Sequence, residues 1–221
     1  MSKARELANL RGTPTDHNIL LQSTAGDAIT AGSGTYNIAL GLNAFGAGTT
    51  GDQNVAIGST AMGTGVTTGS DNIAIGLSAG SAITSGYNSV YIGKNAGDAL
   101  TTGYLNIAMG QNALGVSTTG CYNIAIGELA MGAGNTTGSY NVAIGALSAD
   151  ALTTGICNVA IGTNALGAST TGCRNVAIGE LAIGTGVTTS TYNVAVGFEA
   201  AAALTSGEKN VVLGQCALKA S

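Results

Sequence analysis

The sequence predicts an all-β protein, a parallel β-solenoid (β-roll) of eleven repeats with about 17–18 residues per coil. A phrase of the form N-[VI]-A-[ILMV]-G recurs from residue 37 to residue 214, with SVYIG at 89 and NVVLG at 210 as its variants. Its closing glycines lie 17 or 18 residues apart, and its apolar residues alternate with the period of two typical of a strand. A lone five-residue strand cannot bury its apolar side, whereas strands stacked in register can.

The composition excludes several other classes of protein. Glycine supplies 36 of the 221 residues, and charged residues make up 8%, against about 25% in ordinary globular proteins. A disordered chain would need more charge and more than one proline. The glycines do not recur at every third position, as collagen requires. Every apolar stretch ends well short of the roughly 18 residues of a membrane-spanning helix, so membrane insertion is not expected.

Three types of linker alternate between the phrases, which indicates duplication of a three-repeat block of 52 residues. We expect one coil per repeat, holding two or three short strands with glycine at the corners. Two other topologies remain open: a 52-residue block that forms one large turn, or chains that wind around each other. Gly76 and Gly93 both precede the third linker type, and this out-of-phase copy favours one coil per repeat.

Residues 1–36 precede the repeats and are expected to form an attachment and capping segment, with the shaft at 37–221. ARELANL (4–10) predicts a short helix, and NILLQ (18–22) predicts a strand that caps the first open coil. Three of the seven basic residues lie in this segment, where they could contact an acidic surface of a larger assembly. The candidate attachment residues are Lys3, Arg5 and Arg11.

The asparagine that opens each phrase predicts a stacked ladder of side-chain amides along the rod. An Asn-lined binding stripe is the alternative interpretation. The ladder residues are Asn37, Asn54, Asn72, Asn106, Asn123, Asn141, Asn158, Asn175, Asn193 and Asn210.

The central alanine of each phrase predicts a surface for self-association. If Val and Ile fill the coil, alanine forms an outward ribbon that allows copies of the chain to approach closely around an axis. If alanine points inward, a Val/Ile ribbon is exposed and its burial against partners becomes more necessary. The candidate oligomer ribbon comprises Ala39, Ala56, Ala74, Ala108, Ala125, Ala143, Ala160, Ala177 and Ala195.

The polar residues predict no catalysis and no cofactor. His17 is the only histidine, and no cluster of Cys, Asp or Glu with metal-ligand spacing accompanies it. A net charge of −4 with seven basic residues makes nucleic acid and anionic membranes unlikely partners. The four cysteines are interpreted as reduced apolar fillers. Tyrosines near the ladder positions predict either stacked rings at a corner or an exposed carbohydrate-stacking column.

The repeated N-[VI]-A-[IV]-G…A-L…TTG pattern, over about residues 37–221, resembles the repeats of bacteriophage tail-fibre and other virion-fibre proteins. It is also similar to the β-roll heads of trimeric bacterial autotransporter adhesins, and SKARELANL (2–10) resembles a segment of tailed-phage fibres. These resemblances imply a homotrimeric virion fibre that is assembled in the host cytoplasm. They also imply attachment to other virion proteins through residues 1–36 and contact with a host-surface glycan or protein.

Two other functions are compatible with the repeats. An ice-binding solenoid would present a flat array of threonines. Here the threonines are adjacent, as in Thr101-Thr102, so at most one per coil joins a face. A bacterial cell-surface adhesin is the second alternative.

Overall fold

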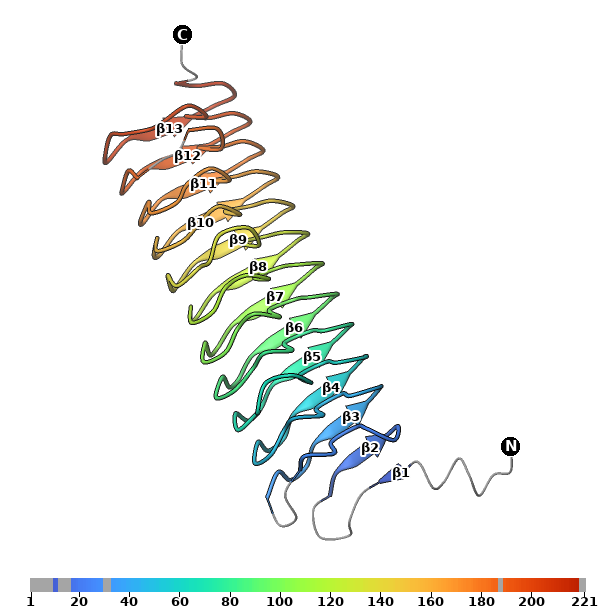
Figure 1. Ribbon diagram of the computed structural model, residues 1–221. Coiled ribbons are helices and arrows are strands. Elements are labelled where there is room, and N and C mark those ends of the chain that lie inside the picture. The colour runs from blue at the N-terminus through green and yellow to red at the C-terminus, as the bar shows by residue number, and fades with distance from the viewer. Residues whose placement is uncertain (1–9, 12–16, 30–32, 187–188, 219–221) are drawn as a thin grey trace.

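The chain forms a single column of stacked coils, with the N-terminal and C-terminal ends at opposite ends of the rod (Figure 1). The computed structural model describes residues 10–11, 17–29, 33–186 and 189–218. One 13-stranded sheet runs through this column in strict chain order, from β1 to β13. Strands β2 to β13 pair in parallel, and residues one repeat apart are partners, as in Val142↔Val159. The predicted topology of one coil per repeat is therefore confirmed.

Each coil of the described chain contributes one strand of three residues, and its remaining residues form turns and bends. The prediction of two or three strands per coil is wrong, because the linkers reverse the chain within a few residues and leave no extended run. The strands are β1 (Leu10–Arg11), β2 (Ile19–Leu21), β3 (Ile38–Leu40), β4 (Val55–Ile57), β5 (Ile73–Ile75), β6 (Val90–Ile92), β7 (Ile107–Met109), β8 (Ile124–Ile126), β9 (Val142–Ile144), β10 (Val159–Ile161), β11 (Val176–Ile178), β12 (Val194–Val196) and β13 (Val211–Leu213).

The regular stack begins before the first recognisable repeat. The strand predicted at NILLQ is confirmed as β2, which pairs in parallel with β3 and so covers the first repeat as one more coil of the solenoid. The outer edge of β2 is covered by β1, which pairs with it in the antiparallel direction. Of the helix predicted for residues 4–10, Leu10 lies in β1 and residues 4–9 lie outside the described chain.

The closing glycine of each phrase is required by the stacking itself. In the coil of β9, Gly145 has a φ of +129°, a conformation that L side chains rarely adopt. A Cβ atom built on Gly145 would lie 2.7 Å from the carbonyl carbon and oxygen of Gly162, the equivalent glycine of the next coil. Both the backbone angle and the contact between coils therefore exclude a side chain.

The core lies inside the coil and is narrow. The middle residue of each strand from β3 to β12 is fully buried, and it is alanine in every one of these strands except β6. Each linker adds a second buried small residue, such as Ala44 or Ala165, and one large apolar side chain.

Two positions in the linker supply the large core residue, and this explains the third linker type. In one kind of coil the residue four places after the closing glycine is large, as in Leu114, and has a φ of +50°. In the other kind that position holds a small residue, and the large residue comes three places later. Gly97 and Leu100 form such a pair.

Candidate functional site

The largest surface feature of the rod is a ribbon of aliphatic side chains along the strands. The first and third residues of β2–β13 point away from the core and are half-buried or exposed, whereas the middle residue is buried. We call these 24 side chains the aliphatic ribbon. Ile75 is 36% exposed and Ile144 is 37% exposed, even though each packs between neighbours in the coils before and after it. The ribbon follows the column of strands from β2 to β13, whose stacking is seen in Figure 1.

The orientation predicted for the alanine ribbon is wrong. Ala39, Ala56, Ala74, Ala108, Ala125, Ala143, Ala160, Ala177 and Ala195 all have zero exposure and lie inside the coil. In these nine coils the alanine shares the narrow interior with the linker's own buried residues, and the larger first and third side chains of the strand point outward. Alanine therefore cannot contact another copy, and Val and Ile form the outer surface instead.

The predicted asparagines form a hydrogen-bonded ladder inside the rod. The backbone N–H of Asn158 donates to Oδ1 of Asn141 in the preceding coil, with an N–O distance of 3.0 Å. The side-chain Nδ2 of Asn141 donates to the carbonyl of Gly155, at 2.9 Å, and thereby closes its own coil. Nine of the ten predicted asparagines are at most 1% exposed, which excludes an exposed Asn stripe there. These nine are Asn37, Asn54, Asn72, Asn106, Asn123, Asn141, Asn158, Asn175 and Asn193.

The tenth predicted asparagine, half-buried Asn210, continues the ladder at the C-terminal end, where its backbone N–H donates to Oδ1 of Asn193. The ladder also extends beyond the predicted positions. At the other end Asn18 accepts the backbone N–H of Asn37 on its Oδ1, at 2.7 Å. In the variant coil, the Oγ of Ser89 accepts the backbone N–H of Asn106 at 3.1 Å, so the chain of bonds continues without an amide.

Tyrosines line the corner that precedes the strands. Tyr87 and Tyr104 are stacked with ring centroids 4.8 Å apart, and Tyr122 and Tyr140 are stacked at 4.7 Å. An edge-to-face contact of 5.4 Å between Tyr104 and Tyr122 joins the two pairs. Tyr104 is not among the tyrosines predicted to stack, since it lies two residues before the ladder asparagine rather than one. Each stacked ring covers one face of its neighbour, which favours structural stacking over carbohydrate stacking.

Other predicted residues lie apart from the aliphatic ribbon. Arg11 is in β1, whereas Lys3 and Arg5 lie outside the described residues. All four cysteines are free, and none is buried, so their interpretation as core fillers is wrong. They lie at the corners, where the coil has no interior volume for them to fill.

Two threonine pairs divide between the interior and the surface, whereas in the pair named above Thr101 is half-buried and Thr102 is exposed. Thr136 is buried and its hydroxyl donates to the carbonyl of Leu152 at 2.8 Å, whereas Thr137 is exposed. Thr67 and Thr68 divide in the same way. Each of these coils therefore presents one threonine of the pair to solvent.

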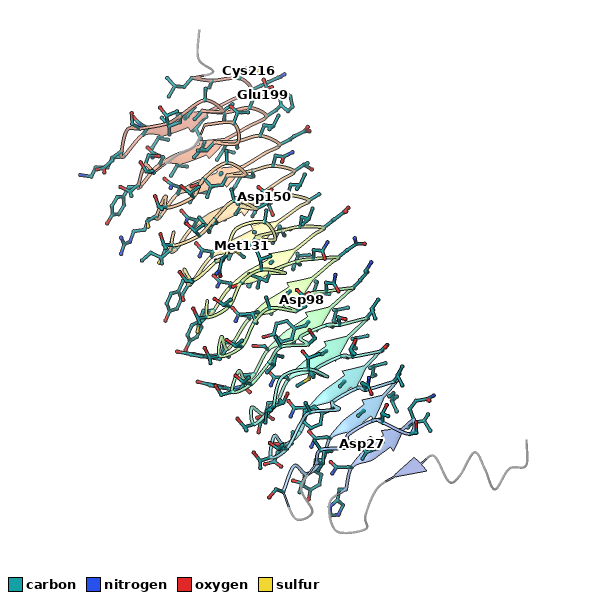
Figure 2. The ribbon with its side chains drawn as sticks, in the orientation of Figure 1. Asp27, Asp98, Met131, Asp150, Glu199 and Cys216 are labelled. Atoms are coloured by element: carbon teal, nitrogen blue, oxygen red, sulfur yellow. The ribbon has the colours of Figure 1, made fainter. Side chains whose placement is uncertain are left out.

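Two half-buried carboxyl groups are electrostatically perturbed. Burial raises the pKa of Asp98 and of Asp150 above the ordinary value of 3.8, and hydrogen bonds from nearby backbone groups oppose this shift only in part. Both residues lie in linkers of the third type, several coils apart (Figure 2). Neither group faces the other, so they do not form a pair of acid and base.

The raised pKa values predict how stability depends on pH. A carboxyl whose pKa is higher in the folded state binds protons more tightly there, so its charged form destabilises the fold at neutral pH. The double substitution Asp98→Asn with Asp150→Asn is expected to raise the melting temperature slightly at pH 7. The difference from the wild type should disappear as the pH falls toward 3.8. Thermal melts followed by circular dichroism at both pH values test this, and a lower melting temperature of the variant at pH 7 would contradict it.

Across the described residues, no group of three or more His, Cys, Asp or Glu side chains is arranged to hold a metal ion. In the same part of the chain, no helix has the length and hydropathy needed to cross a membrane. No protein-family model matches the sequence, and neither a curated protein nor a solved structure shows significant similarity to it.

Proposed function

We propose that this chain is a structural fibre shaft of a bacteriophage virion, in which three copies pack side by side through their aliphatic ribbons. The single observation that carries the proposal is the ribbon itself, which extends along the full length of the sheet. The resemblance of the repeats to tail-fibre proteins supports the proposal that the shaft belongs to a bacteriophage virion. Contact with a host surface and attachment through residues 1–36 belong to the same proposal.

The size of the ribbon supports self-association. Twelve coils at about 4.8 Å give a length of roughly 55 Å, and three residues across give a width of about 10 Å. The flat footprint is therefore roughly 550 Å², at the upper end of the apolar patches of about 300–600 Å² found on monomers. This is less than the roughly 800 Å² per partner of a standard interface, so the proposed association also requires contacts from the residues that flank the ribbon.

The construction of the rod supports a mechanical role. Neighbouring coils are joined by backbone hydrogen bonds on the strand and by the buried Asn ladder, as at Asn141 and Asn158. Each coil is therefore fixed at several points around its perimeter, and the column resists both bending and twisting. A stiff spacer of defined length is what a fibre shaft requires.

The association can be tested by measuring mass in solution. The wild-type chain is expected to have three times its 21.4 kDa mass in light scattering coupled to size-exclusion chromatography. The double variant Ile144→Lys with Ile161→Lys should be monomeric and remain folded by circular dichroism, because both side chains point out of the coil. Desolvating two lysines at an apolar interface costs several kcal/mol.

Thr137→Lys with Thr154→Lys is the matched control, since it adds the same charge at exposed positions away from the ribbon. This variant should keep the trimer mass. A monomeric wild type, or a trimeric ribbon variant, would exclude the proposed association.

The virion setting has its own test. Deleting residues 1–9, which precede the capping strand β1, should abolish incorporation of the protein into phage particles while the purified fibre remains a trimer of the shortened chain. Incorporation is read by immunoblot of purified particles. Normal incorporation of the truncated chain would contradict attachment through this segment.

A further inference from the structure

The two edges of the aliphatic ribbon carry different residues. The edge before each strand is formed by the residue that precedes the ladder position, and we call it the leading edge. The edge after each strand is formed by the residue that follows the closing glycine, and we call it the trailing edge. In the coil of β11 these residues are Arg174 and Glu180, and both are exposed. Among the coils of the described phrases, this is the one with a charge at both edges, and the two charges are opposite.

Within one chain these two groups are separated by the full width of the ribbon. Asn175 to Gly179 lie between them, which corresponds to roughly 15–20 Å at about 3.3 Å per residue. Arg174 instead lies over the ring of Tyr192, with 5.4 Å between its guanidinium carbon and the ring centroid. Arg174 and Glu180 of the same protomer are therefore too far apart to form an ion pair with each other.

Large apolar side chains occupy both edges in two other coils. In the coil of β12, Tyr192 and Phe198 are 48% and 42% exposed. In the coil of β3, Tyr36 and Leu42 are 58% and 55% exposed. These two coils lie near opposite ends of the rod (Figure 1). Large apolar side chains therefore occupy both the leading and the trailing edge close to each end of the column.

Symmetry determines which edges meet when copies associate. If copies are related by rotation about an axis parallel to the rod, the leading edge of one faces the trailing edge of the next in the same coil. If a two-fold axis instead runs along the strands, like edges meet and the order of the coils is reversed. Only the parallel arrangement brings Arg174 to Glu180, Tyr192 to Phe198 and Tyr36 to Leu42.

We infer that copies of this chain associate in parallel and in register, with the Arg174 edge of each protomer against the Glu180 edge of its neighbour. This rests on the proposed function, because it requires that the aliphatic ribbon is the interface. It adds the direction and the register of the copies. In this arrangement the Arg174–Glu180 contact and the two apolar contacts close the seams on either side of the ribbon. No coil of the described phrases then brings like charges together at these two edges.

Disulfide trapping tests the register directly. Cys121, Cys157, Cys173 and Cys216 are replaced by serine, and Arg174→Cys is combined with Glu180→Cys in the full chain. A disulfide requires Cα atoms about 4.4–6.8 Å apart, far less than the separation of these positions within one chain. Mild oxidation is therefore expected to link chains to one another and to yield covalent trimers on a denaturing gel.

Two matched pairs test an offset of one coil in either direction: Arg174→Cys with Thr163→Cys, and Arg174→Cys with Phe198→Cys. Both should link chains more slowly than the in-register pair. Faster linking by either offset pair would overturn the register. Efficient linking by Arg174→Cys alone would indicate that like edges meet, and would overturn the parallel arrangement.

A charge exchange provides a second measurement without cysteine. Arg174→Glu alone and Glu180→Arg alone should each weaken association by about tenfold or more in the dissociation constant, whereas the combined variant should recover most of this loss. Additive losses in the combined variant would contradict the contact. Light scattering distinguishes a failure of the proposed register from a failure of the proposed trimer. A trimer that links in another pattern overturns only the register, whereas a monomeric wild type overturns the proposed function as well.

Discussion

Replacing Asn141 with leucine is expected to lower the free energy of unfolding by about 2–6 kcal/mol, because two buried backbone groups lose their partners at about 1–3 kcal/mol each. These are the N–H of Asn158, which donates to Oδ1 of Asn141, and the carbonyl of Gly155, which accepts from Nδ2. Leucine has a similar volume, so the loss reports the hydrogen bonds rather than a cavity. Thermal and urea unfolding followed by circular dichroism measure it.

Asn141→Ser is the matched control, since the rod already accommodates serine at one ladder position. The Oγ of Ser89 accepts the N–H of Asn106, and a serine at 141 could accept the N–H of Asn158 in the same way. We therefore expect the serine variant to lose roughly half as much stability as the leucine variant. A leucine variant that is as stable as the wild type would show that the ladder contributes nothing to the fold.

Replacing Tyr91 with alanine is expected to cost about 3–5 kcal/mol, the usual range for removing a large aromatic side chain from a core. Tyr91 occupies the buried middle position of β6, where every other strand from β3 to β12 has alanine. Space for its ring comes from Gly80 and Gly97, because a Cβ atom built on Gly97 would overlap the ring and one built on Gly80 would lie 3.0 Å from it. Truncation therefore leaves a cavity that extends between two coils.

A compensating substitution tests this explanation. Other coils place leucine at the position of Gly97 with the same left-handed backbone, as Leu114 does at a φ of +50°. Tyr91→Ala combined with Gly97→Leu should therefore recover a large part of the loss, whereas Gly97→Leu alone should destabilise the protein by overlap with the ring. If the combined variant were no more stable than Tyr91→Ala, the idea that a side chain at position 97 can fill the space of the Tyr91 ring would be disproved.

The hydroxyl of Tyr91 has no hydrogen-bond partner among the described residues. Burial raises the pKa of this phenol to about 12, and the nearby Ser89 side chain acts in the opposite direction without forming a hydrogen bond to the hydroxyl. Tyr91→Phe should accordingly leave the melting temperature unchanged or raise it, because it removes a buried polar atom without changing the packing. A clear decrease in the melting temperature would mean that the hydroxyl does have a stabilising partner.

The positions of the coils and of the ladder could be predicted because they depend on spacing alone. A phrase repeated every 17 or 18 residues places its asparagines one above another once each repeat forms a coil. The contact of Tyr91 with Gly80 and Gly97 could not be predicted from the sequence. Gly80 belongs to the preceding coil, and it lies against the ring only because the coils stack. Stacked tyrosines at a corner were predicted as one of two alternatives, but Tyr104 was not assigned to the stack, because it belongs to a column next to that of Tyr122 and Tyr140.

The sequence by itself determined the period of the solenoid, the parallel register of its strands and the column of asparagines, since each follows from identical residues at a constant interval. Only the tertiary structure decided which side of the strand faces inward. Val142, Ala143 and Ile144 are all apolar, so their alternation is compatible with either orientation. The choice depends on the width of the coil, which is set by linker residues such as Ala165 and Leu166 on the opposite wall. In the coils with a central alanine, that wall leaves room for a methyl group, and the larger side chains point outward, to where we propose that other copies bind.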